Sequence, residues 1–160
     1  MSQRGRYELD ETGWMILEEL QENARISFKD LANKVKLSPT AVIERVRRME
    51  EEGIITGYRA MVDPRKVGFT LSALINMSTN YGNPDDIIGE VIADIPEVVS
   101  CWSITGTSDF LLEVQVSTLE FLEELLTALS KHGKLTTSIV LPSSVRKRLV
   151  KQPRHGLSEA

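Results

Sequence analysis

The chain has 160 residues, of which 41% are hydrophobic, enough for one packed core or two small ones. The 19 Lys and Arg against 23 Asp and Glu give a formal net charge of −4, so the overall composition does not indicate a nucleic-acid-binding protein. No apolar run approaches the roughly 20 residues that span a bilayer, and residues 1–6 lack the apolar stretch of a secretion signal, which predicts a cytoplasmic protein with no membrane partner.

Charge is distributed unevenly along the chain. Residues 1–61 hold 10 basic and 11 acidic side chains, residues 62–142 hold 4 and 11, and residues 143–160 hold 5 and 1. Within residues 34–48, the single acid Glu44 stands among these cations: Lys34, Lys36, Arg45, Arg47 and Arg48. Neutralising DNA phosphates requires local clustering of this kind, whatever the net charge of the whole molecule.

The first predicted helix runs from about Glu11 to Gln21, with Asp10 as its N-cap. A short helix, a tight turn and another helix follow over residues 31–49. Ser38 suits the N-cap of the last helix and Pro39 its first position, where a missing N–H has no helical partner to lose. The apolar positions Val42, Val46 and Met49 recur at helical spacing and are expected to face a core.

This pattern is typical of a DNA-binding helix-turn-helix, whose second helix enters the major groove with its first turn leading. The candidates for contacts to base edges are Ser38, Thr40, Ala41, Glu44 and Arg45. The candidates for contacts to phosphates are Lys36, Arg47 and Arg48. Two alternatives stay open: Arg45 is held in an ion pair within the domain, or Glu44–Arg48 and Arg47–Glu51 are ordinary pairs on a solvated helix face.

Gly53 suits the end of this helix, and Ile54–Val62 is expected to be extended, as in winged versions of the motif. Pro and Gly then interrupt the pattern between Asp63 and Gly68. We therefore predict a winged helix-turn-helix domain over residues 1–62 and a linker over residues 63–69.

Residues 70–142 show a different periodicity. Strands are expected over Leu71–Met77, Val98–Thr105, Phe110–Val116 and Leu135–Leu141. One helix is expected to start at the cap Asn83 and to continue to about Ile95. Another is expected to start at a Ser117–Glu120 capping box and to stop at Gly133.

The order strand–helix–strand–strand–helix–strand predicts a ferredoxin-like βαββαβ domain, in which both helices cover one face of an antiparallel sheet. The whole chain is thus predicted to be an α+β protein. Because the chain offers no third layer to cover the other sheet face, the sequence predicts a homodimer. The basic tail, residues 143–160, has two interpretations: it attracts DNA or an acidic neighbouring subunit, or it is a disordered solubilising end.

The sequence contains no recognisable metal or cofactor site. Its single cysteine, Cys101, has no partner for an internal disulfide, and His132 and His155 do not complete a metal-ligand pattern. Cys101 is predicted to be a small buried apolar residue rather than a reactive thiol. The adjacent Asp85 and Asp86 fit the first turn of a helix, where acids are stabilising, better than a catalytic pair.

The chain resembles the Lrp/AsnC, or feast/famine, family of transcription regulators over nearly its whole length. The segments that carry the resemblance are Leu9-Asp10, Ile16-Leu17, Leu20-Gln21, Ala24–Ser27, Leu31-Ala32, Leu37–Thr40, Arg45-Val46, Glu51–Ile55 and Gly57-Tyr58. The resemblance implies double-stranded DNA as a partner, dimers that pair through their sheets and build tetramers or octamers, and an amino acid or related metabolite bound between dimers. One departure is Gly13, where similar proteins usually have an acid.

The resemblance also implies an effector site at the turn between the second and third strands of the second domain. The candidates are Gly106, Thr107, Ser108 and Asp109 of that turn, together with Thr137 and Ser138 of the last strand. The turn keeps the family's Gly and its last Asp but lacks the first acid and the usual aromatic residue. The hydroxyls and the hairpin N–H groups could bind an α-carboxylate; alternatively, Gly106 only permits the turn and the hydroxyls only cover the sheet.

Three classes of function follow from these observations. The first is a nucleoid-associated transcription regulator that responds to a metabolite, and the second is an architectural DNA-binding protein without an effector. The third is an enzyme, because some relatives of this architecture decarboxylate tetrapyrroles with a histidine of the second domain. Residues 99–106 contain no histidine, and neither His132 nor His155 is placed to substitute, so the sequence predicts that the protein is not an enzyme.

Overall fold

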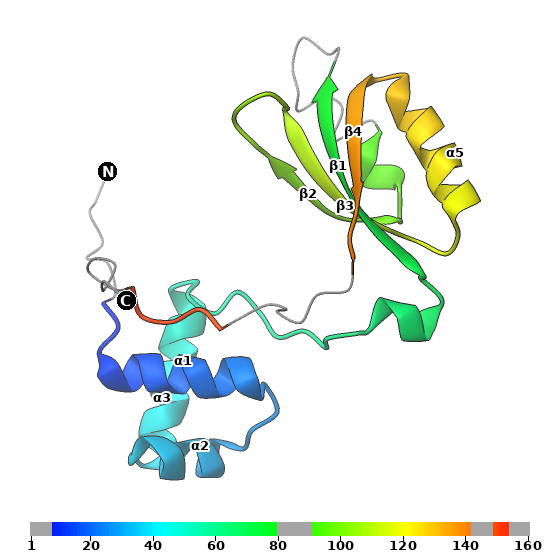
Figure 1. Ribbon diagram of the computed structural model, residues 1–160. Coiled ribbons are helices and arrows are strands. Elements are labelled where there is room, and N and C mark those ends of the chain that lie inside the picture. The colour runs from blue at the N-terminus through cyan, green and yellow to red at the C-terminus, as the bar shows by residue number, and fades with distance from the viewer. Residues whose placement is uncertain (1–7, 80–90, 142–148, 154–160) are drawn as a thin grey trace, which may run out of the picture. The chain divides into compact units, whose positions relative to one another are not determined.

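A computed structural model of the chain describes residues 8–79, 91–141 and 149–153 (Figure 1). The chain divides into two compact units, one made of residues 1–61 and 145–160 and the other of residues 62–144. Each unit contains its own cluster of buried apolar side chains. The two units are described separately below.

The first unit contains three helices, α1 (Glu11–Glu22), α2 (Phe28–Val35) and α3 (Pro39–Glu51). Each begins at a side-chain cap that accepts a backbone N–H three residues further on: Asp10 from Gly13, Ser27 from Asp30 and Ser38 from Ala41. The predicted caps Asp10 and Ser38 are therefore confirmed, as is Pro39 in the first turn of α3.

The three helices close a small apolar core. The predicted inward side of α3 is confirmed, since Val42, Val46 and Met49 are at most 2% exposed. They meet Ile16 and Leu20 of α1 and the buried residues of α2, which are Leu31, Ala32 and Val35. Because each fully buried aliphatic side chain contributes about 1.5–3 kcal/mol, this core fixes how α3 lies on the other two helices.

The turns around α3 depend on left-handed backbone. Lys36, between α2 and α3, has φ +56° and ψ +42°, a conformation that only Gly and Asn adopt readily. Gly53 has φ +70°, and the Ile54 N–H donates to the Met49 carbonyl at 2.8 Å, which ends α3 as predicted. Residues 56–63 then form neither helix nor strand, so the expected extended segment lacks a strand to pair with in the described part of the unit.

The second unit begins with a short 3₁₀ helix, η1 (Pro64–Val67), and contains a four-stranded sheet. Its strands are β1 (Leu71–Thr79), β2 (Val98–Ser103), β3 (Phe110–Val116) and β4 (Gly133–Ile139), in the spatial order β2-β3-β1-β4 with every neighbouring pair antiparallel. This is the predicted ferredoxin-like order. The helix expected from Asn83 lies largely outside the described residues, and η2 (Ile92–Asp94) occupies part of its expected C-terminal end.

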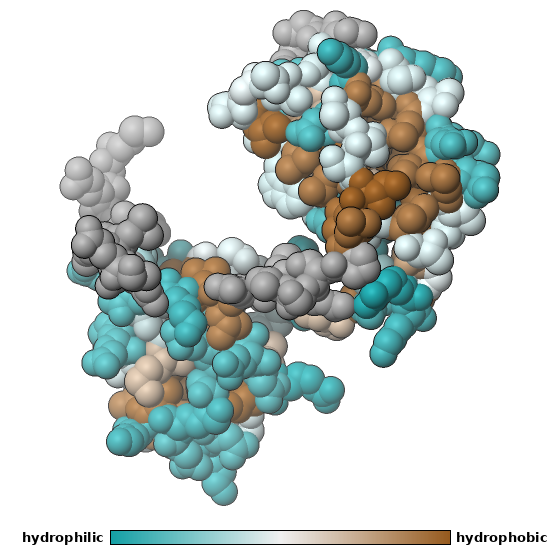
Figure 2. Space-filling model, in the orientation of Figure 1, coloured by the Kyte–Doolittle hydropathy of each residue, from teal (hydrophilic) through white to brown (hydrophobic). Residues whose placement is uncertain are grey.

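One face of the sheet is packed and the other is not. Ala73, Ile75 and Met77 of β1 and alternate residues of β3 are fully buried, and α5 (Leu119–Ser130) covers them with Leu122, Leu125 and Leu129. On the opposite face, Leu111 is half-buried and its neighbour Trp102 is 46% exposed. Apolar residues are accordingly visible on the surface of this unit in Figure 2.

Several boundaries differ from the prediction: β1 extends two residues further, to Thr79, β2 ends at Ser103 instead of Thr105, and β4 begins and ends two residues earlier than expected. Thr118, not Ser117, caps α5, because its hydroxyl accepts the Phe121 N–H at 3.1 Å. Gly133 does not end that helix, which stops at Ser130, but begins β4. A Cβ on Gly133 would lie only 2.3 Å from the Ser78 carbonyl oxygen, so the close pairing of β4 with β1 requires glycine at this position.

Candidate nucleic-acid interface and ligand site

The eight candidate DNA-contacting residues lie on α3 and on the turn before it. Arg47, Arg48 and Glu44 are exposed on the helix, and so are Thr40 in its first turn and the two turn residues Lys36 and Ser38. Ala41 and Arg45 are half-buried. The structure thus places six of the eight on α3 and the other two, Lys36 and Ser38, in the turn that leads into it.

Arg45 is engaged within the first unit. Its two terminal nitrogens donate to the two carboxylate oxygens of Asp10, each at 2.8 Å. This bidentate pair and the Gly13 N–H hold the pKa of the Asp10 carboxyl below its usual value. Of the two alternatives for Arg45, the structure therefore shows the internal ion pair, which links the cap of α1 to the middle of α3.

Gly13 makes room for that pair. A Cβ on Gly13 would lie 2.8 Å from a side-chain carbon of Leu9 and 3.2 Å from a carboxylate oxygen of Asp10. A larger residue would therefore push the Asp10 carboxylate away from its cap position or displace Leu9. The departure from the family pattern at this position weakens helix propensity, but it leaves space for the Asp10–Arg45 contact.

The remaining cations of α3 face an area of mixed charge. Arg47 donates to Glu51 at 2.9 Å in an exposed i,i+4 pair. Such a pair contributes about 0–1 kcal/mol and opens at little cost when a phosphate competes for the guanidinium. Arg47 and Arg48 line a shallow polar depression of about 720 Å³, whose lining also contains acidic residues, among them Glu8 and Glu52.

Hydrogen bonds hold the turn of the candidate ligand site against the end of β1. Gly106 has φ +119°, and the Asp109 carboxylate accepts the Thr79 N–H at 2.7 Å. The Thr107 carbonyl accepts the Ser78 hydroxyl at 2.8 Å. The retained Gly and Asp of the family pattern thus close the turn against β1, and the Asp109 carboxylate already has a backbone partner.

Thr137 and Ser138 lie elsewhere on the sheet. Thr137 is opposite the buried Ile75 and half-buried, whereas Ser138 is opposite Leu74 and exposed on the other face. Both are separated from the turn by β1, and Ile75 is four residues from Thr79, about 13 Å along the strand. A single copy of the chain therefore does not bring the two halves of the candidate ligand site together.

Cys101 is half-buried against the sheet core, and burial raises the pKa of its thiol, which makes it a poor nucleophile. Within residues 8–79, 91–141 and 149–153, no three His, Cys, Asp or Glu side chains are grouped so as to hold a metal ion. In the same ranges, no helix has the length and apolar character needed to cross a membrane.

Three partners of the candidate residues were not predicted. Asp10 was expected only as a helix cap, although it also binds Arg45 across 35 residues. Ser78 and Thr79, which hold the ligand-site turn, are the last two residues of β1, beyond Met77, where the predicted strand ends. None of these contacts leaves a signal in local spacing, because each depends on how distant elements pack.

Comparison with known proteins identifies both units. Residues 9–56 match a family model described as winged helix-turn-helix DNA-binding, and residues 72–150 match the Lrp/AsnC ligand binding domain. The chain is 38% identical over 122 residues to the Bkd operon transcriptional regulator of Pseudomonas aeruginosa, a match that covers 75% of this chain and 80% of that protein. The chain belongs to the Lrp/AsnC family. Another relative, the HTH-type transcriptional regulator LrpC of Bacillus subtilis, is 31% identical over 132 residues, covering 82% of this chain and 91% of LrpC.

Solved structures of this Lrp/AsnC family agree with the fold. The structure of B. subtilis LrpC superimposes with a TM-score of 0.83 at 29% identity, covering 88% of this chain and all of that one. A Neisseria meningitidis transcriptional regulator in complex with L-Met gives a TM-score of 0.82 at 30% identity, covering 89% of this chain and 96% of that one. Residues 9–56 thus correspond to a winged helix-turn-helix DNA-binding domain of this family, and residues 72–150 to its ligand binding domain.

Proposed function

We propose that the protein is a transcription regulator that contacts duplex DNA through α3, assembles through its second unit, and responds to an amino acid or a related metabolite. The observation that carries the DNA part is the exposed set of side chains on α3, which starts at a confirmed cap and presents Thr40, Arg47 and Arg48 to solvent. Such a helix fits a major groove with its first turn leading. Its site of action would be the nucleoid, in the cytoplasm.

Contacts on α3 divide into two groups by their chemistry. The first turns of a recognition helix contact base edges, and the candidates there are Ser38, Thr40, Ala41 and Glu44. The candidates for contacts to phosphates are Lys36, Arg47 and Arg48. Arg45 is assigned a positioning role, because Asp10 already binds both of its terminal nitrogens. The test is binding of the full chain to duplex DNA over a series of salt concentrations; an affinity that does not change with salt would contradict the proposal.

Assembly would use the open face of the sheet. Trp102 is 46% exposed there, beside the half-buried Leu111, and a second copy would cover both. Because one chain does not bring the 106–109 turn to Thr137 and Ser138, a ligand site made of both requires residues of another copy. Sedimentation of the full chain tests the assembly: a monomer at micromolar concentration would contradict it.

We propose that the effector is an amino acid. The N. meningitidis relative was solved in complex with one, L-Met. The test is a thermal-shift screen of L-methionine, L-leucine and the other amino acids at millimolar concentration. A ligand present at about 100 times its Kd stabilises the folded state by about 2.7 kcal/mol, which moves the melting temperature by several degrees.

The second candidate function is an architectural DNA-binding protein that assembles without an effector. The observation in its favour is that the Asp109 carboxylate and the Thr107 carbonyl are occupied by β1. This candidate predicts salt-sensitive DNA binding with no amino acid that raises the melting temperature. Neither candidate assigns a catalytic role to the protein.

A further inference from the structure

The first unit carries an apolar groove that the functions proposed above do not use. It has a volume of about 400 Å³ and runs between α1 and the segment that follows α3. Leu9, Trp14 and Leu17 line one side, and Ile54, Ile55 and Met61 line the other. The one described residue of the C-terminal segment that lines it is Val150.

A specific contact holds the C-terminal segment at this groove. The Gln21 side-chain nitrogen donates to the Val150 carbonyl at 2.9 Å, and the Val150 N–H donates to the Gln21 side-chain oxygen at 2.8 Å. One carboxamide thus satisfies both backbone groups of one residue, as a neighbouring β-strand would. Val150 itself is 69% exposed, so its backbone rather than its side chain is recognised.

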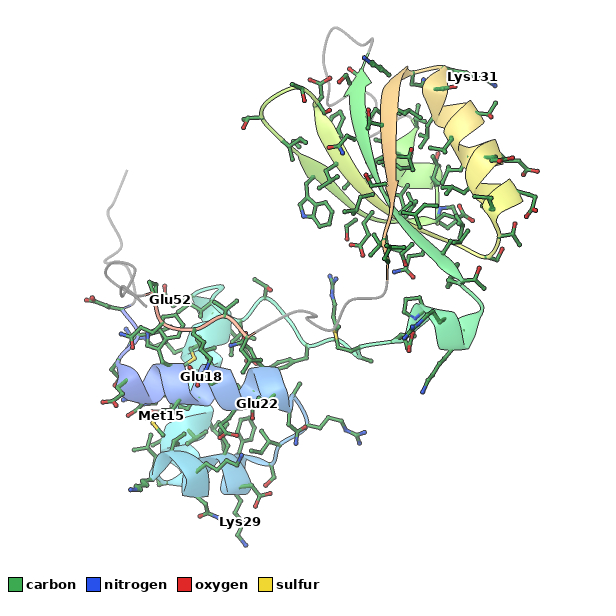
Figure 3. The ribbon with its side chains drawn as sticks, in the orientation of Figure 1. Met15, Glu18, Glu22, Lys29, Glu52 and Lys131 are labelled. Carbon is green, nitrogen blue, oxygen red and sulfur yellow. The ribbon has the colours of Figure 1, made fainter. Side chains whose placement is uncertain are left out.

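Charge favours the same docking. α1 contains four glutamates and no basic residue, and two of them, Glu18 and Glu22, project from the helix in Figure 3. Residues 143–160 contain five basic side chains and one acidic side chain. Attraction between the two sets of charges is expected to weaken as salt is added.

We propose that the apolar groove of the first unit is a docking site for this chain's own C-terminal segment, with the backbone of Val150 held on α1 by Gln21. The chain leaves the first unit after residue 61 and returns to it at residue 145. Docking therefore holds the end of the chain on the first unit by non-covalent contacts, in addition to the covalent link between residues 61 and 62. This inference stands on the contacts of the first unit and does not depend on the proposed function.

The test is hydrogen exchange at the Val150 amide in the full chain. Gln21→Ala removes both hydrogen bonds on an exposed helix position where Ala is well tolerated, so Val150 exchange should become at least about tenfold faster. Gln21→Glu keeps an acceptor for the Val150 N–H but places a second acceptor against the Val150 carbonyl, so Val150 exchange should be faster than in the native chain and slower than in Gln21→Ala. Gln152→Ala, which removes an exposed carboxamide of the segment itself, is the matched control and should leave the rate unchanged.

A second readout uses the fluorescence of Trp14, which lines the groove. In a Trp102→Phe background Trp14 is the single tryptophan of the chain. Ending that chain after Arg148 should shift the Trp14 emission to longer wavelength, because the groove becomes more exposed to water.

Equal exchange at Val150 in the native chain and in Gln21→Ala would overturn the proposal. So would duplex DNA that accelerates Val150 exchange as much as Gln21→Ala does, since the segment would then be a DNA-binding arm rather than an occupant of the groove. Two results together would support the docking. The Val150 amide should exchange slowly in the native chain even when DNA is present, and it should exchange faster in both Gln21 variants.

Discussion

The two candidate sites of this protein are built in different ways. In the first unit, the eight candidate DNA-contacting residues lie between Lys36 and Arg48 on one helix and its preceding turn. In the second unit, the candidate ligand residues come from the 106–109 turn and from Thr137 and Ser138, which face opposite sides of the sheet and lie beyond β1. A site on one helix is fixed by local spacing, whereas a site made from several strands depends on register and on neighbouring molecules.

The largest predicted effect tests whether the second unit is independent of the first. Gly133→Ala would place a Cβ about 2.3 Å from the Ser78 carbonyl oxygen and force β4 away from β1, destabilising the second unit by about 3 kcal/mol. Urea unfolding followed through Trp102 in a Trp14→Phe background should report the loss. The same measurement through Trp14 in a Trp102→Phe background should show no change in the stability of the first unit.

Gly106→Ala is the control for this substitution. Gly106 has a positive φ but open space around its Cβ position, so only the backbone strain of about 1 kcal/mol is expected. Equal losses at both tryptophans in Gly133→Ala would mean that the two units unfold as one.

A smaller effect is predicted for the cations of α3. Replacing Arg47 and Arg48 together by Ala should weaken binding to any duplex about 30-fold at 0.15 M salt and reduce the salt slope by about two. Anisotropy titrations over a salt series measure both quantities. Lys131→Ala, which removes one exposed cation from the second unit (Figure 3), should leave the slope unchanged.

The Asp10–Arg45 pair predicts a pH-dependent effect. Because the pKa of Asp10 is lowered in the folded state, its carboxylate contributes stability above its ordinary pKa of about 4, and this contribution is lost as the pH falls through the folded value. Asp10→Asn keeps the helix cap but loses the charge, so it should destabilise the first unit by under about 1 kcal/mol at pH 7. The difference should vanish in strong acid; thermal unfolding at pH 7 and pH 2 measures it, and a constant difference would be evidence against the pair.

The smallest effect concerns the segment after α3. Burial, together with a hydrogen bond from its hydroxyl to Glu50 at 2.9 Å, raises the pKa of Tyr58 to about 12. The fold should therefore lose stability between about pH 10 and pH 12, where Tyr58 ionises in the unfolded chain but not in the folded one. The tyrosinate absorbance of the native chain minus that of Tyr58→Phe gives this pKa; a value near 10 would show that the Tyr58 hydroxyl is not held against Glu50.

Most of the fold could be predicted from the sequence because its signals are local. Ser38 and Pro39 fix the start of α3, and the alternation of Ala73, Ile75 and Met77 gives the packed face of β1. Gly133 was misassigned because a glycine after a helix usually marks its end, while the reason for this one is a backbone contact with Ser78, 55 residues earlier.

The contacts that the sequence did not predict share one property. Asp10 with Arg45, Thr79 with Asp109 and Gln21 with Val150 each join residues at least 30 positions apart. Periodicity and capping rules describe residues within one element, so they cannot pair a carboxylate or a carboxamide with a partner from a distant element. The candidate site on α3 was therefore better predicted than the interactions that position it.

The left-handed backbone at Lys36 creates a conflict between two demands on one position. The left-handed backbone of the turn between α2 and α3 favours glycine or asparagine at position 36, whereas binding to a DNA phosphate favours a cation there. Lys36→Gly would relieve the backbone and remove the charge, so a more heat-resistant protein with weaker affinity for DNA is the expected product. Selection for the regulator's function would then have kept a residue that selection for stability alone would have replaced.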